Sequence, residues 1–241
     1  MSEFASTFIA HAALWILLAF SIASWALIVL KALQAMRTGR ADRRFERSFQ
    51  RAADLDAAAR LSEGAETDSS RAQVAAAFFG ALAHAAHGHE PSPTCKNLCE
   101  RALAQRIRKA RRASEQGLAV LASIGSTAPF VGLFGTVFGI IHALSAISHR
   151  ASASIDVVAG PIGEALVATG VGIAVAVPAV LAYNFFVRRS KTLSADLDDF
   201  ANDLLALAEK RDFKLRTEPR PGTVPASATP LRKETAREAL A

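Results

Sequence analysis

Charged residues are missing from three long stretches of this chain, and apolar or small residues fill each of them. Glu3 and Lys31 bracket 27 residues without Asp, Glu, Lys or Arg. The second stretch covers residues 116–148, and the third, 157–187, carries only the charge of Glu164. Each exceeds the roughly 20 residues that a helix needs to cross a bilayer core. The pattern predicts an all-α membrane protein with three transmembrane helices.

The lengths of these stretches refine the prediction. Residues 12–30 of the first stretch span about 28 Å as a helix, which matches one bilayer core. A secretory signal peptide is the alternative for this stretch. Glu3 and the absence of an N-terminal cation disfavour it, and the apolar run is too long. The second and third stretches are longer, so we expect these helices to tilt or to extend beyond the lipid.

Lysine and arginine are distributed unevenly around the three stretches. Residues 1–13 contain neither, the connector 149–156 contains only Arg150, residues 31–116 contain sixteen, and the segment from Arg188 onward contains eleven. The positive-inside rule therefore places the N-terminus outside and both basic segments in the cytoplasm. This topology accounts for the net charge of +6, so a nucleic-acid partner is not needed.

The polar segments are also predicted to be helical. Two or three helices are expected over 37–113, broken near Glu63 and near Pro91. Beyond the third span, apolar residues spaced four and three apart predict a buried heptad seam that packs against helices of the same or a neighbouring subunit. This seam comprises Leu193, Leu197, Phe200, Leu204 and Leu207. Pro, Thr, Ser and Ala dominate from Thr217 onward and predict disorder.

These predictions divide the chain into consecutive segments along its length. They are a short outside N-terminus (1–11), a first span (12–36), a cytoplasmic helical loop (37–116), a second span (117–148), an outside connector (149–157), a third span (158–188), a cytoplasmic helix (189–216) and a disordered tail (217–241). The basic string 106–112 precedes the second span. It is typical of a positive-inside anchor, and a specific contact with anionic lipid head groups is the alternative.

Two cysteines lie near three histidines in the cytoplasmic loop. Cys95 and Cys99 are too few for a disulfide-dense fold. Their spacing from His84, His87 and His89 fits no standard zinc pattern, so a packing role is favoured and no metal is expected. Motifs of nucleotide binding, serine hydrolases and zinc proteases are missing as well. The sequence therefore indicates a protein that is not an enzyme and needs no cofactor.

Glycines and threonines mark the second and third spans. Gly132, Gly135 and Gly139 share one helical face, which indicates close helix packing. Thr136 lies beside that face, and Thr169 lies in the third span. A buried threonine usually bonds its own backbone carbonyl, but it can also face a polar pore, so both interpretations stay open.

Glu164 is the charged residue that most needs an explanation. A charge deep in lipid costs about 3 kcal/mol or more. As part of a helix, Glu164 lies some 36 Å from Arg188, which places it near the outer end of the span. It can therefore be an interfacial residue that snorkels, a cap of a helix that begins after Pro161, or part of an ion path.

Two motifs resemble a known family. Residues 122–144, ASIGSTAPFVGLFGTVFGIIHAL, resemble the second span of the ExbB/TolQ/MotA proton-channel family. Residues 158–184, VAGPIGEALVATGVGIAVAVPAVLAYN, resemble the third span of its ExbB/TolQ branch. The order of the spans, the short connector and the large cytoplasmic loop also match. Phe138 replaces the tryptophan usual in that family's second span, which is a conservative aromatic change.

This resemblance implies the subunit of a motor in the bacterial inner membrane, with its N-terminus in the periplasm. Five copies would form a ring around two helices of an ExbD-like or TolR-like partner, whose aspartate exchanges protons. The proton motive force would then drive TonB in outer-membrane transport, or TolA in envelope maintenance. By motif, Glu164, Thr136 and Thr169 match pore-lining positions of the family near that aspartate.

Alternatives within and outside the family stay open. The run STAPFVGLFGTV and the closing EKRDFKL favour the ExbB side of the branch over the TolQ side. A non-conducting membrane scaffold could use the same glycine-packed helices, but it has no reason to place an acid on a pore-facing wall. An intramembrane enzyme is disfavoured, because no paired acid, histidine or cysteine groups lie at membrane depth.

Overall fold

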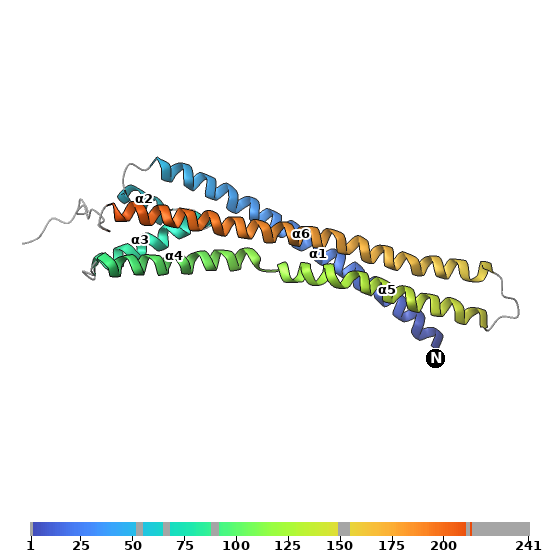
Figure 1. Ribbon diagram of the computed structural model, residues 1–241. Helices are drawn as coiled ribbons and strands as arrows, with labels where there is room; N and C mark the ends of the chain where they lie inside the picture. Colours follow the sequence, from blue (N-terminus) through green and yellow to red (C-terminus); the bar gives the residue numbers. More distant parts are fainter. Residues whose placement is uncertain are drawn as a thin grey trace, which may run out of the picture.

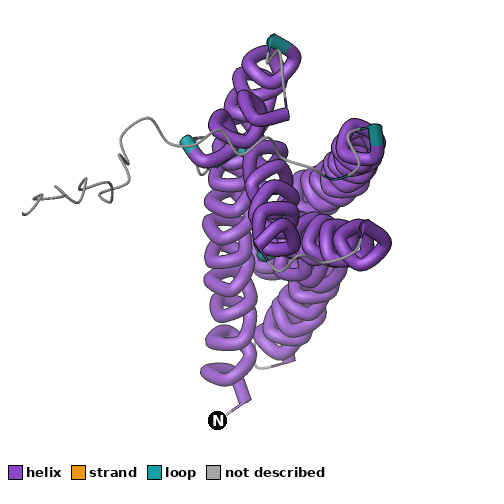
Figure 2. The backbone as a smooth tube through the Cα atoms, turned by 90° about the vertical axis from the view of Figure 1, so that its left-hand side faces the viewer, coloured by secondary structure: helices purple, strands orange, loops and turns teal. Residues whose placement is uncertain are grey.

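The computed structural model describes residues 2–51, 55–64, 68–87, 92–148, 155–210 and 213. Within these ranges the chain forms helices and short turns (Figure 2). The helices are α1 (Ser2–Gln50), α2 (Leu55–Glu63), α3 (Ser70–His87), α4 (Ser92–Glu115), α5 (Leu118–Ser148) and α6 (Ile155–Glu209). The expected tail, 217–241, lies outside the described residues.

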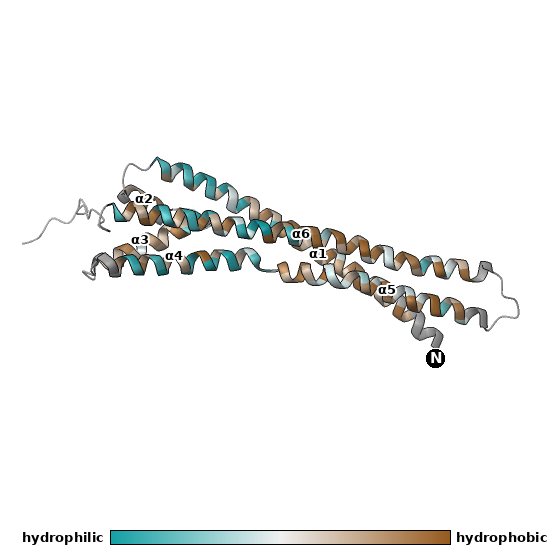
Figure 3. Cartoon of the chain, in the orientation of Figure 1, coloured by the Kyte–Doolittle hydropathy of each residue, from teal (hydrophilic) through white to brown (hydrophobic). Residues whose placement is uncertain are grey.

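The molecule is long and narrow because α1 and α6 run along most of its length (Figure 1). With 55 residues, α6 is about 82 Å long, far more than a bilayer core requires. Figure 3 shows apolar residues concentrated at one end of the molecule and polar residues at the other. We call residues 12–30 of α1, all of α5 and residues 158–187 of α6 the membrane half, and the remaining described residues the polar half.

Three helical segments of the described chain are long and apolar enough to cross a membrane. They are His11–Gln50, Thr94–Ser145 and Val158–Glu209. Their apolar parts coincide with the membrane half, where large side chains such as Trp15, Phe130 and Leu181 are exposed. The number of spans and the all-helical architecture predicted from the charge-free stretches are confirmed.

The middle segment is interrupted between α4 and α5. Gly117 has a φ of +78°, a conformation that favours glycine and commonly ends a helix. Lys31 of α1 donates hydrogen bonds to the carbonyl oxygens of Ala113 (3.2 Å) and Ser114 (3.0 Å), near the end of α4. An ammonium group here satisfies carbonyls that lack a helical partner and complements the negative end of the helix dipole.

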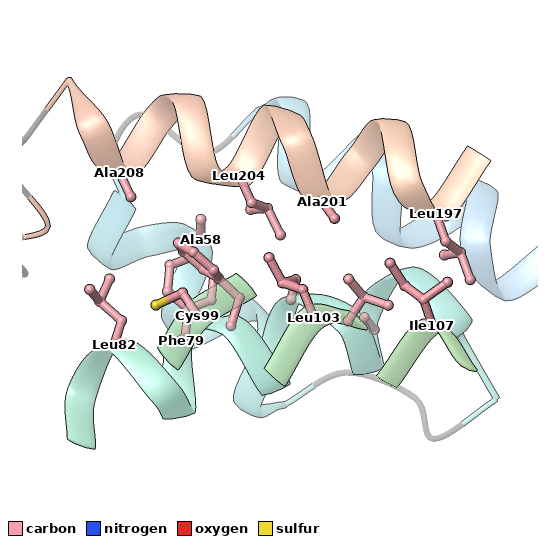
Figure 4. Packing of buried hydrophobic residues seen from close by; sticks show 14 of the residues in the cluster. Ala58, Phe79, Leu82, Cys99, Leu103, Ile107, Leu197, Ala201, Leu204 and Ala208 are labelled. Atoms are coloured by element: carbon pink, nitrogen blue, oxygen red, sulfur yellow. The ribbon is translucent and has the colours of Figure 1, made fainter. Parts of the chain in front are cut away.

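A hydrophobic core fills the polar half between α6 and the helices α3 and α4 (Figure 4). Leu197 and Leu204 of α6 are fully buried there, so most of the predicted seam packs inside its own chain. Leu207 lies outside this core, because 41% of its surface is exposed in the single chain. The buried stripe instead continues through Ala201 and Ala208, whose small side chains let α6 approach the helices below it.

A second core joins α1, α5 and α6 in the membrane half. Leu17 of α1 and Leu121 of α5 are fully buried in it, together with Ala179 of α6. Small residues are frequent in this core, as expected where membrane helices associate by close packing and not by exclusion of water. These contacts place α5 and α6 side by side, and they bring together the residues that the sequence singled out.

Candidate proton path between α5 and α6

Glycines set the distance between α5 and α6. A Cβ atom added at Gly132 would lie 2.6 Å from the carbonyl oxygen of Ala168, and one added at Gly139 would lie 2.6 Å from the Cβ of Ala165. Real Cβ contacts under 3.0 Å are essentially unknown. Only glycine therefore fits at these two positions without displacing a helix.

Gly135 lies where all three membrane helices meet. A Cβ atom there would be 3.2 Å from the Cβ atoms of both Ala13 in α1 and Ala168 in α6. Close packing at Gly132, Gly135 and Gly139 is the arrangement expected from their helical spacing.

Two further glycines make equally close approaches that the sequence analysis did not single out. A Cβ atom at Gly125 would lie 2.5 Å from Cγ2 of Val180, and one at Gly172 would lie 2.7 Å from the carbonyl oxygen of Ala128. A sequence pattern that indicates this close approach is the run of small residues at spacings of three and four in the third span. Ala165, Ala168, Gly172, Ala176 and Ala179 form this run, and all are buried.

The two threonines meet across the α5–α6 contact. Thr136 is buried, and its Oγ1 donates a hydrogen bond to the carbonyl oxygen of Leu133 at 2.7 Å. Thr169 is half-buried, and its Oγ1 lies 3.5 Å from that of Thr136, at the outer limit for a hydrogen bond. A hydroxyl that already donates to the backbone can still accept, so the two groups form a polar pair inside an apolar interface.

Glu164 lies apart from this pair. Its side chain is exposed, and it forms no hydrogen bond or ion pair with the described part of the chain. Helix α6 begins at Ile155, so Glu164 lies beyond the first turn of the helix. The alternative that it caps a helix beginning after Pro161 is therefore wrong, since Pro161 lies inside α6.

The surroundings of Glu164 are apolar on the exposed face. Val167 lies one turn further along α6 on the same side as Glu164, and it exposes 59% of its surface. Glu164 and Thr169 are about 140° apart around an ideal helix and about 7.5 Å apart along its axis. A single chain thus pairs Thr136 with Thr169 but leaves Glu164 on a different face.

The cysteines of the polar half belong to its hydrophobic core. Cys99 is fully buried, and Cys95 nearly so, among residues of α3, α4 and α6. Burial raises the pKa of the Cys99 thiol to about 12, and the neighbouring Cys95 adds to the rise. His84 is exposed on α3, whereas the side chain of His87 and all of His89 lie outside the described residues. Among the described residues, no group of three or more His, Cys, Asp or Glu side chains could hold a metal ion.

Comparison with known proteins identifies the family. The model of the MotA/TolQ/ExbB proton channel family matches residues 71–199, which include Thr136, Glu164 and Thr169. The chain belongs to the MotA/TolQ/ExbB proton channel family. A biopolymer transport protein ExbB from Xanthomonas campestris is 39% identical over 194 residues, covering 78% of this chain and 77% of the relative.

Two other members of the MotA/TolQ/ExbB family show how the chain compares with an ExbB and with a TolQ. An ExbB from Neisseria gonorrhoeae is 61% identical over 93 residues, which cover 39% of this chain and 42% of the relative. A Tol-Pal system protein TolQ from Pseudomonas aeruginosa is 32% identical over 198 residues, covering 81% of this chain and 85% of the relative. The family and the three spans together show a multi-pass membrane protein with an ExbB-like role in a proton channel.

Proposed function

We propose that this chain is the ExbB-type channel subunit of an inner-membrane motor. With an ExbD-type single-span partner, it would use the proton motive force to energise TonB-dependent transport across the outer membrane. Higher identity to an ExbB than to a TolQ over similar lengths supports this choice. The N-terminus would lie in the periplasm, because the basic residues gather in the polar half. On this proposal the protein moves protons and performs no enzymatic step.

The exposure of Glu164 is the observation that carries the proposal. Its side chain is exposed in the membrane half, one helical turn from exposed Val167. If this face met lipid, the ionised carboxylate would cost about 3 kcal/mol or more. A polar surface that covers it in the assembled protein would avoid this cost, which supports a pore-facing position over a lipid-facing one. A ring of copies around the helices of a partner supplies such a surface, and five copies are the number that the family resemblance implies.

Thr136 and Thr169 are proposed to contribute a second polar site, between α5 and α6 and on a different face of α6 from Glu164. Their hydroxyl groups lie together in the membrane half, where polar groups are rare and often functional. A hydroxyl can accept one proton and donate another, which suits a group that fixes water or relays protons. Each proton that crosses supplies about 2.3 kcal/mol per 100 mV of membrane potential.

The test is neutralisation of Glu164. We expect Glu164→Gln, which keeps the shape, and Glu164→Ala to abolish TonB-dependent uptake while the oligomer stays assembled with its partner. Thr136→Val and Thr169→Val should reduce uptake less severely. Glu100→Gln is the matched control, because Glu100 is an exposed acid of the polar half, and it should leave uptake unchanged.

The outcomes separate the alternatives. Full uptake in Glu164→Ala at normal protein levels would contradict the proton path and favour a non-conducting scaffold. Co-purification with a TolR-like rather than an ExbD-like protein, together with loss of envelope integrity in place of uptake, would assign the chain to the Tol-Pal system.

A further inference from the structure

A cavity of about 720 Å³ opens where the membrane half meets the polar half. Its walls come from α1, the start of α3, the end of α4 and the middle of α6. The cavity lies at the polar end of the membrane half, because two of its lining residues, Lys31 and Phe186, lie where the apolar stretches of α1 and α6 end. We call it the basic cavity. Its size is within the range of small-molecule sites, and it is separate from Thr136, Thr169 and Glu164.

Cations outnumber carboxylates around the basic cavity. The cationic lining residues are Lys31, Arg37, Arg43, Arg71, Arg106, Lys109 and Arg189. The acidic ones are Asp42, Glu46, Asp68 and Asp196. This excess of positive charge favours an anionic occupant.

Two of these carboxylates are already engaged by the protein. Asp42 is buried and accepts hydrogen bonds from Oγ of Ser69 (2.8 Å) and from the backbone N–H of Arg71 (3.0 Å). Glu46 forms an ion pair with the Arg71 side chain. Both therefore hold α1 against the start of α3, and the ion pair with Glu46 takes up the charge of Arg71 as well.

The structure divides the basic string of α4 into two groups. Arg106, which is half-buried, and Lys109, which is exposed, line the basic cavity, whereas the exposed Arg108 and Arg112 do not. Arg111 forms a salt bridge of 2.8 Å with Glu115. A general positive-inside anchor needs no such division, so the cavity-facing pair calls for its own explanation.

Arg189 approaches α1 at a position that lacks a side chain. Its Nη2 atom lies 3.3 Å from where a Cβ atom would stand on Gly39, so a side chain there would make the flexible guanidinium shift by a few tenths of an ångström. Gly39 and Arg189 both line the cavity. A planar guanidinium is well suited to bind a phosphate through paired hydrogen bonds.

The lining is also apolar on its membrane side. Leu30, Leu33 and Phe186 contribute to it, and Leu30 exposes 62% of its surface. A free inorganic anion gains nothing from contact with apolar side chains, whereas a lipid has both a charged head group and apolar acyl chains. Basic pockets between membrane helices are known to take anionic lipid head groups.

We propose that the basic cavity binds an anionic glycerophospholipid. The phosphodiester lies among Arg106, Lys109 and Arg189, and the upper acyl chains lie against Leu30 and Leu33, which are exposed. Because the cavity joins α1, α4 and α6, a bound lipid would act as a wedge that fixes the polar half relative to the membrane half.

The experiment compares two double variants of the same helix. Arg106→Gln/Lys109→Gln removes the cavity-facing pair, and Arg108→Gln/Arg112→Gln removes the same charge from the exposed face. Each full-length protein is purified in a neutral detergent, and its bound lipid is identified by native mass spectrometry and lipid extraction. We expect phosphatidylglycerol or cardiolipin on the wild type and on the exposed-face variant. Affinity for added phosphatidylglycerol should fall about 30-fold in the cavity variant.

Several outcomes would overturn the proposal. Equal lipid loss in both variants would indicate unspecific attraction, and no loss in either would show that the cavity is not the site. Stabilisation of the wild type by glycerol phosphate as strongly as by phosphatidylglycerol would assign the cavity to a free anion. If the wild type carries no lipid and the Ala113→Cys variant crosslinks to another protein chain, the basic cavity is a site for a protein partner.

Discussion

The contact between Gly132 and Ala168 allows a direct test of how closely α5 and α6 pack. In Gly132→Ala, the new Cβ atom would lie 2.6 Å from the Ala168 carbonyl oxygen and 3.1 Å from the Cα of Thr169. Both neighbours are backbone atoms, so no flexible side chain can move aside. The two helices must therefore separate by a few tenths of an ångström.

Two opposing effects determine the size of the change. Overpacking a tight contact typically costs 1–3 kcal/mol. Alanine is up to about 1 kcal/mol more favourable than glycine inside a helix, which offsets part of that cost. We expect a net loss of roughly 1–2 kcal/mol in the free energy of unfolding.

The same displacement reaches the threonine pair. The Thr136 and Thr169 hydroxyls are 3.5 Å apart, so a further separation of a few tenths of an ångström would break their contact. Gly132→Ala should therefore also reduce TonB-dependent uptake, although it removes no polar group.

The assay is unfolding of the purified protein in mixed micelles, followed by circular dichroism as the fraction of SDS increases. Gly160→Ala is the matched control, because Gly160 belongs to the membrane part of α6 and a Cβ atom there meets nothing within 4 Å. It should be as stable as the wild type or slightly more stable. A Gly132→Ala protein that equals this control in stability and uptake would refute the close approach of α5 and α6.

Two further predictions concern the polar half. The double variant Leu197→Asp/Leu204→Asp should destabilise the chain by several kcal/mol and lower its thermal midpoint, because both side chains are fully buried, whereas Leu207→Asp on the exposed face should change the midpoint little. Equal midpoints for the two would contradict the seam packing inside its own chain. Cys99 should resist alkylation near neutral pH until the protein unfolds, because burial raises the pKa of its thiol from 9.0 to about 12. As pH rises above 9.0, the unfolded chain loses this proton while the folded chain keeps it, so the free energy of unfolding should fall, and Cys99→Ala should weaken that fall. Fast alkylation of native Cys99, followed by mass spectrometry, would refute this burial.

Membrane spanning was predictable from the sequence because it depends on a local property. A stretch without charges must leave water whatever the rest of the chain does, and its length alone decides whether it can span a bilayer. The face that carries Gly132, Gly135 and Gly139 was visible for a similar reason, since helical spacing follows from the geometry of one helix. The chemistry of Glu164 also stood out, because one charge among apolar residues needs no partner to be noticed.

Other features depended on which helices meet, and only the tertiary structure decided them. Thr136 and Thr169 are 33 positions apart, and nothing local in either span predicts that their hydroxyls pair. The heptad spacing did not show that α6 buries Ala201 and Ala208 within its own chain, because α6 packs there against several helices and not along one seam. Four helices contribute to the basic cavity, and its cations look like an ordinary positive-inside cluster in the sequence. One-dimensional patterns report the environment that a residue prefers, whereas the partner it meets there depends on how every helix in the fold is packed.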